Sequence, residues 1–161
     1  MTYLLFPCYL IMFSALLYYL AVKNHIQVGG RIAIASFLLK VAMGCLYGYI
    51  FLHYYGGDDT WRYHYQSQEE TALLMKDPLK FFTSLFDLND QTSYSAMFES
   101  VDSYWKELEY VLLIKLIAIF NLFSGGHYYI NVIWFSFLSF WGGYYFYHLF
   151  NRTYPGYKKS M

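Results

Sequence analysis

Apolar residues gather into four long runs along the chain, separated by one long polar segment and two short ones. An α-helix of roughly 20 apolar residues is long enough to cross the hydrocarbon core of a bilayer, about 30 Å thick. The pattern therefore predicts an all-α, polytopic membrane protein with one membrane domain. Its four transmembrane helices are expected over residues 3–22, 32–55, 108–123 and 130–150.

The long polar segment, residues 56–107, contains helical patterns of its own. Thr60–Met75 is expected to form a helix, and Asp77 followed by Pro78 is a favoured helix start. Apolar residues then recur at helical spacing over 79–86. This predicts a short amphipathic helix that cannot span a membrane but suits its interface.

Glycines and polar residues mark the ends of the other elements. Gly29-Gly30 and Gly125-Gly126 are expected to interrupt helices. Residues 89–95 predict a turn, and residues 97–104 predict an amphipathic piece that continues into the third span. A basic tail, residues 151–161, follows the fourth span. The first run has no positive n-region and no small-residue cleavage site, so it is expected to be a retained helix.

Composition agrees with a membrane protein. The 161 residues are 58% hydrophobic and 14% charged, whereas a soluble domain is about 25% charged. All eleven acidic residues lie between Asp58 and Glu109, and the net charge of zero gives no indication of nucleic-acid binding. Cys8 and Cys45 both lie in apolar runs and are expected to be buried thiols without a disulfide.

Two features of the apolar runs admit more than one interpretation. Gly44 and Gly48 have the spacing that lets two membrane helices approach closely, and ordinary helix packing explains them. Lys40 and Lys115 lie within predicted spans, where an ionisable residue is a functional candidate. Together with Asn131 they keep a small transporter or channel open as an alternative.

The stretch from His53 to His64, where the second apolar run gives way to the polar segment, is the main candidate for chemistry. Asp58 and Asp59 follow Gly56-Gly57, which gives the backbone freedom to turn sharply. An aspartate here can act as a general base towards a hydroxyl group. The alternative is structural, with Asp58 or Asp59 capping a helix that starts near Thr60.

The same stretch holds further polar groups. Arg62 can bind a phosphate group through two parallel hydrogen bonds. Paired carboxylates suit a hard divalent cation, and imidazoles can add to a metal site. A divalent cation bound by His53, Asp58, Asp59 and His64 is therefore an open alternative, although the spacing matches no established metal motif. No other cofactor is predicted.

Three segments, Leu46–Trp61, Asp77–Phe82 and Leu112–Asn131, together resemble the N-terminal part of bacterial multi-spanning membrane proteins of the GT-C glycosyltransferase and surface-polysaccharide polymerase type. In GT-C enzymes an early extracytoplasmic loop carries an acidic residue near the end of a span, and juxtamembrane amphipathic helices follow it. The resemblance implies a multi-pass protein of the bacterial inner (cytoplasmic) membrane that uses a polyprenyl-phosphate sugar as donor.

By the same resemblance, Asp58 or Asp59 is the expected catalytic residue. Trp61, Arg62 and His64, in the same stretch of sequence, are predicted to bind the substrate. The resemblance also favours an extracytoplasmic position for residues 56–107. The distribution of Lys and Arg favours the cytoplasm mildly, because the long segment and the tail together carry more of them than the short connections. The alternative function is a non-catalytic subunit or scaffold that packs against other membrane subunits.

Overall fold

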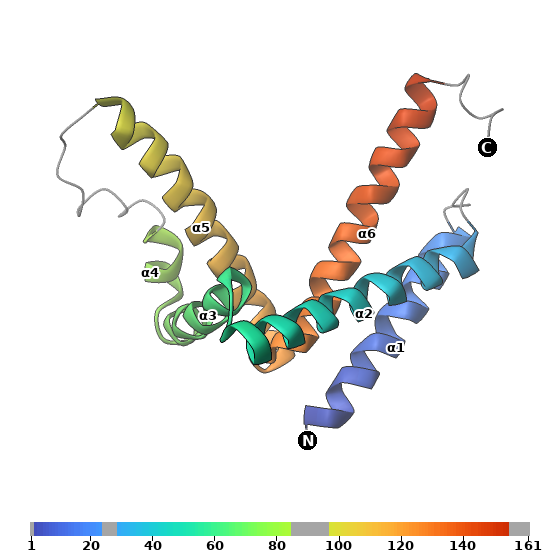
Figure 1. The fold of residues 1–161 in the computed structure, drawn as a ribbon, viewed down its shortest axis with the longest axis horizontal. Helices are drawn as coiled ribbons and strands as arrows, with labels where there is room; N and C mark the ends of the chain where they lie inside the picture. Colours follow the sequence, from blue (N-terminus) through green and yellow to red (C-terminus); the bar gives the residue numbers. More distant parts are fainter. Residues whose placement is uncertain (1, 24–28, 85–96, 155–161) are drawn as a thin grey trace. The chain divides into compact units, whose positions relative to one another are not determined.

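A computed structural model of the chain describes residues 2–23, 29–84 and 97–154, and the backbone alone at residues 2–3 and 97–107. Every regular element in these ranges is an α-helix, which confirms the predicted all-α class (Figure 1). In chain order the helices are α1 (Thr2–Lys23), α2 (Gly30–Tyr55), α3 (Asp59–Lys76), α4 (Pro78–Thr83), α5 (Met97–Ser124) and α6 (Tyr128–Thr153).

The two N-terminal helices are each long and apolar enough to cross a membrane, over Leu4–Lys23 and Gly30–Tyr55. Leu108–Ser124 and Tyr128–Thr153 pass the same test only together, as a pair that bends at the break between them. The described residues thus hold two candidate spans, or three if the bent pair is one span. Four separate spans stay a prediction.

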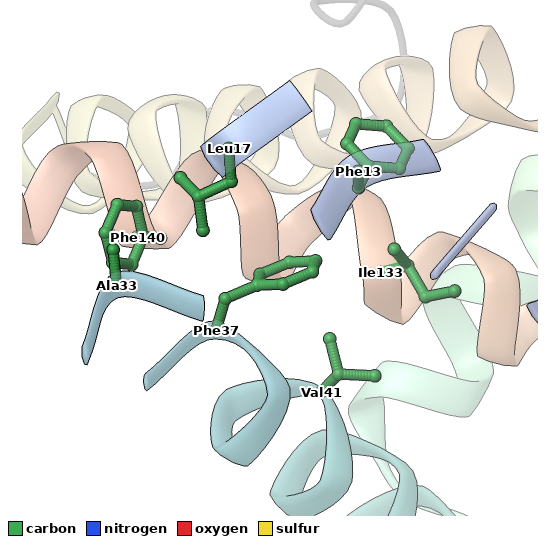
Figure 2. Close-up of a cluster of buried hydrophobic side chains, with 7 residues drawn as sticks. All are labelled: Phe13, Leu17, Ala33, Phe37, Val41, Ile133 and Phe140. Atoms are coloured by element: carbon green, nitrogen blue, oxygen red, sulfur yellow. The ribbon is translucent and has the colours of Figure 1, made fainter. Parts of the chain in front are cut away.

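The chain forms two compact units, and the first consists of residues up to Tyr47 and from Val132 onward. Its core contains one face of α1, on which Phe13 and Leu17 are buried one turn apart, and a matching face of α2. Figure 2 shows the side chains of three helices turned towards one another in this core: Phe13, Leu17, Ala33, Phe37, Val41, Ile133 and Phe140.

The outer faces of α1 and α2 are also largely apolar, although Ser36 and Lys40 are exposed within α2. Ile11 in α1 is 69% exposed and Leu39 in α2 is 64% exposed. A helix that is hydrophobic all round needs an apolar environment on every side, which a bilayer provides. Within this unit, the Lys40 ammonium donates a 3.0 Å hydrogen bond to the Ser139 hydroxyl.

The second unit, Gly48–Asn131, contains α3, α4 and most of the described part of α5. Asp77 joins α3 to α4: its N–H donates to Leu73 O, which closes α3, and its carboxylate accepts from Lys80 N at 3.0 Å, which caps α4. With Pro78 in the first turn, this confirms the predicted helix start. Helix α4 ends at Thr83, and the predicted turn at 89–95 lies outside the described residues.

Helix α5 begins at Met97, so the predicted amphipathic piece and the third apolar run form one continuous helix. It ends as predicted at Gly125 and Gly126, whose φ angles of 64° and 72° lie in the left-handed region. Gly126 N–H donates back to Asn121 O at 3.2 Å, which satisfies a carbonyl at the helix end.

The two glycines of the close-packing motif are both required by their neighbours. A Cβ atom on Gly44 would lie 2.7 Å from a methyl carbon of Val132 in the first unit. In the second unit, a Cβ atom on Gly48 would overlap the ring of Tyr128. Both positions therefore exclude larger residues, in agreement with the packing interpretation.

Lys115 ties α3, α4 and α5 together. Its ammonium lies 2.8 Å from the Glu70 carboxylate, 2.6 Å from Phe81 O and 2.9 Å from Ser84 Oγ. It also lies 4.1 Å from the centre of the Phe81 ring, and Lys115 is only 4% exposed. Three acceptors and one aromatic face thus satisfy a charge that would be costly to leave unpaired in the interior.

We expect Lys115→Met to lower the thermal stability of the detergent-solubilised protein. Removing one partner of a buried ion pair leaves the other partner uncompensated. The loss should be about 2–3 kcal/mol, below the range for a fully buried pair because the Glu70 side chain retains 29% exposure. Lys76→Met, on the exposed end of α3, is the matched control; equal melting temperatures for the two variants would contradict this account.

Candidate functional site

The sequence places its candidate residues at the start of α3, and the path of the chain there depends on two glycines. Gly56 and Gly57 have φ angles of 74° and 115°, which side-chain-bearing residues rarely adopt. Gly57 N–H donates to Phe51 O at 2.9 Å and so ends α2. The chain then turns within three residues into α3.

Asp58 is the N-cap of α3. Its Oδ1 atom accepts from Thr60 N at 3.1 Å, Trp61 N at 3.2 Å and the Thr60 hydroxyl at 2.7 Å. These bonds satisfy backbone groups that the helix itself leaves unpaired. The structural interpretation of this aspartate is therefore confirmed, and its carboxylate is half-buried against the helix end.

Asp59 has a different environment, although it is the next residue. It lies in the first turn of α3 and is exposed to solvent. Arg62 follows one turn later and is exposed as well. Of the two adjacent carboxylates, only that of Asp59 therefore points outward at the protein surface.

The guanidinium of Arg62 is held by Tyr110 of α5. Arg62 Nε donates to the Tyr110 hydroxyl at 3.4 Å, and the guanidinium carbon lies 5.2 Å from the centre of the ring. The interaction with Tyr110 raises the pKa of Arg62 above its ordinary value, with a smaller contribution from Asp59. Arg62 is thus a fixed positive charge with further N–H donors available to an anion.

Trp61 points into the second unit and is 7% exposed. Its indole N–H donates to Gly48 O at 2.9 Å, and its ring stacks on Tyr128 with ring centres 3.9 Å apart and planes inclined by 8°. The Tyr128 hydroxyl lies 2.9 Å from the Thr60 hydroxyl, which itself donates to Asp58. The start of α3 is thereby fixed to the start of α6.

His64 is buried one turn further along, with 6% exposure. Its ring lies edge-on to Trp61 and to Tyr128, and its Nε2 atom lies 3.2 Å from Gln68 Nε2. Among the described residues, His64 Nδ1 has no hydrogen-bond partner. Burial lowers the pKa of His64, and the charge of His127 lowers it further.

The contacts of His53 are with its own helix and not with these side chains. It is exposed in the last turn of α2, where its Nδ1 atom lies 2.9 Å from Tyr49 O and its ring stacks on Tyr49. Over the described residues, no three His, Cys, Asp or Glu side chains gather as a metal site. The alternative of a divalent cation at His53, Asp58, Asp59 and His64 therefore has no geometric support.

Neutral polar side chains of α3, α5 and α6 form a hydrogen-bonded cluster in the interior of the second unit. Asn121 Nδ2 donates to Ser67 Oγ at 2.9 Å and to Thr71 Oγ1 at 3.1 Å, and Asn131 Nδ2 donates to Asn121 Oδ1 at 2.7 Å. Thr71 also donates to Ala118 O. The sequence alone does not connect these residues. The helical spacing of Trp61, His64, Ser67 and Thr71 was the available sign that they share one face of α3.

No family model, no curated protein and no solved structure matches this chain. The fold and its apolar helices define an all-helical protein with candidate membrane spans. Its function is therefore inferred from the site itself.

We expect the folded state to lose stability on acidification through the ordinary histidine pKa of 6.5. Since the pKa of His64 is lowered in the folded state, the unfolded chain binds a proton in this range that the folded chain does not bind. Unfolding then becomes easier as the pH falls, and stability is recovered as it rises.

Melting temperatures of the parent and of His64→Phe, measured between about pH 7.5 and about pH 5.5, test this expectation. His64→Phe retains an aromatic ring against Trp61 and should lose most of the pH dependence. His53→Phe, at an exposed position, should keep it. The same decrease in all three proteins would show that His64 does not cause it.

Proposed function

We propose that the chain is a multi-pass module of the bacterial cytoplasmic membrane that transfers sugars from a polyprenyl-phosphate donor, as GT-C glycosyltransferases do. In this proposal the four apolar runs are four spans, and α3 lies on the extracytoplasmic side. The resemblance of Leu46–Trp61, Asp77–Phe82 and Leu112–Asn131 supports the class of enzyme.

One observation carries the proposal: an exposed carboxylate, Asp59, lies one helical turn from an exposed guanidinium, Arg62, directly after a candidate membrane span. The pair offers a proton acceptor and an anion-binding group close together at the end of an apolar helix. A phosphate on a long isoprenoid chain has matching properties, with its charge at one end and an apolar tail beside the span.

Arg62 is suited to the donor phosphate. Its interaction with Tyr110 restrains the side chain before any ligand binds, and a guanidinium stays charged at any working pH. A planar guanidinium can give two parallel hydrogen bonds to phosphate oxygens. Arg62 would therefore orient the phosphate and stabilise the negative charge that develops on it as the sugar leaves.

Asp59 is suited to the acceptor. Its carboxylate takes the proton of the acceptor hydroxyl while the hydroxyl oxygen bonds to the anomeric carbon of the donor sugar. The bond between that carbon and the phosphate oxygen breaks, and polyprenyl phosphate leaves with the bonding electron pair. Asp58 supports this step indirectly, because its capping hydrogen bonds fix the helix turn that carries Asp59.

The test uses the same substitution at two adjacent carboxylates. Asn is as good an N-cap as Asp, so Asp58→Asn should retain both the fold and the activity. Asp59→Asn removes the base and should lower transfer by about 10²-fold or more. Its melting temperature should fall only slightly, because the start of α3 loses one favourable charge. Transfer of radiolabelled sugar from polyprenyl-phosphate glucose or mannose is measured in membranes that contain each variant.

Glu69→Gln is a further control, because Glu69 is an exposed carboxylate elsewhere on α3. Transfer by Asp59→Asn at the level of the parent would remove the enzymatic proposal. A loss of transfer in Glu69→Gln would show that the assay responds to general surface charge and not to Asp59.

The second candidate function is a non-catalytic membrane subunit. It is favoured by the internal use of the other conspicuous residues: Asp58 caps a helix, Trp61 bonds to Gly48, and His64 is buried. A partner would be another membrane protein. Unchanged transfer in Asp59→Asn, together with recovery of a stoichiometric partner from detergent extracts, would favour this function.

A further inference from the structure

The second unit has two exposed faces of opposite character. Helices α3 and α5 pack through Ser67, Thr71, Ala118 and Asn121, which are all buried or half-buried. Residues on the far side of each helix point away from this contact. The two outer faces therefore lie on opposite sides of the α3–α5 pair, and each can be described from its own residues.

The outer face of α5 is entirely apolar for more than three turns, from Val111 to Phe123. Leu112 is 49% exposed and Leu116 is 37% exposed, and Phe123, at 59%, continues the same stripe at helical spacing. Between Val111 and Phe123, each α5 residue that is exposed or half-buried is apolar. Glu109 is exposed one turn earlier and marks the polar end of the stripe.

The outer face of α3 is mostly polar and charged. Its exposed residues include Asp59, Arg62, Tyr65, Glu69 and Lys76. The Arg62 guanidinium also contacts Tyr110 of α5, and the apolar residues Ala72 and Met75 are exposed near the end of the helix. Charged side chains are costly against hydrocarbon and occur at membrane depth only where they face water or other protein. This face therefore suits a hydrated environment, on the side of the pair opposite to the apolar stripe of α5.

We propose that the α3–α5 pair separates lipid from water, with the α5 stripe of Leu112, Leu116 and Phe123 against acyl chains and the outer face of α3 against water. Lipid is the occupant of the stripe for two reasons. The same chain contains candidate membrane spans, and Leu108–Ser124 belongs to the bent helix pair that passes as a span. The stripe also lacks any polar group between its ends that a protein partner would bind.

The buried contacts of α5 allow the α3–α5 pair to separate lipid from water. Lys115 and Asn121, the polar residues in the apolar part of α5, point to the inside of the unit and find partners there. The lipid side of α5 is consequently free of polar groups, although its sequence contains them. A water-filled space next to α3 follows from the proposal, and Asp59 and Arg62 face it.

The experiment attaches a polarity-sensitive fluorophore (NBD) to single cysteines in the full chain, in a Cys8→Ser, Cys45→Ser background, reconstituted into phosphatidylcholine vesicles. Leu112→Cys and Phe123→Cys report on the stripe, and Glu69→Cys reports on the outer face of α3. Leu39→Cys, on the exposed face of a candidate span, is the reference for lipid contact. Each labelled protein must melt like the parent before it is compared.

Nitroxide groups on lipid acyl chains and a water-soluble nitroxide are the two quenchers. We expect the stripe labels to be quenched by lipid as strongly as Leu39→Cys and to be protected from the aqueous quencher. Glu69→Cys should give the reverse result. Protection of the stripe labels from both quenchers would show a protein partner there, and lipid quenching of Glu69→Cys would show that α3 does not face water; either result overturns the proposal.

Discussion

The helix packing of the second unit is determined by one constraint: polar groups that are buried away from water must have hydrogen-bond partners. Lys115 is the strongest case, because its ammonium is buried and receives partners from two other helices: Glu70 of α3 and Phe81 and Ser84 at α4. A buried ammonium without these partners would destabilise the folded state. The positions of α3 and α4 against α5 are therefore those at which this charge, and the amide of Asn121, are satisfied.

The same requirement gives two neighbouring aspartates different roles. Asp58 meets the unpaired N–H groups at the start of α3, so its carboxylate is committed to the backbone. Asp59 is the first residue of the helix, and its side chain is exposed to solvent. A pair of identical residues thus supplies one structural carboxylate and one exposed carboxylate, and the exposed one is next to the charge of Arg62.

Features that depend on local sequence could be predicted well. The four apolar runs, the cap at Asp77-Pro78 and the helix ends at Gly56-Gly57 and Gly125-Gly126 follow from helix length, capping and backbone freedom, which involve residues a few positions apart. The capping role of Asp58 was one of two alternatives, and the sequence could not decide between them. The exposure of each aspartate depends on the residue at which the helix begins. A sequence pattern does not fix that position to a single residue.

Features that depend on distant residues could not be predicted. Glu70 and Lys115 are 45 positions apart, and Ser67 and Asn121 are 54 apart. Nothing in one sequence pairs such residues. Lys115 and Asn131 therefore suggested a transport path from sequence alone, whereas the structure gives each a partner within the second unit. The stacking of Trp61 on Tyr128 was missed for the same reason.

In the proposed enzyme, the outer face of α3 faces water on the extracytoplasmic side of the membrane. This position is tested by labelling Glu69→Cys, an exposed position on that face, with a membrane-impermeant maleimide on intact cells in a Cys8→Ser, Cys45→Ser background. We expect intact cells to be labelled at the level seen after permeabilisation. Labelling that appears only after permeabilisation would put α3 in the cytoplasm and would rule out the extracytoplasmic site.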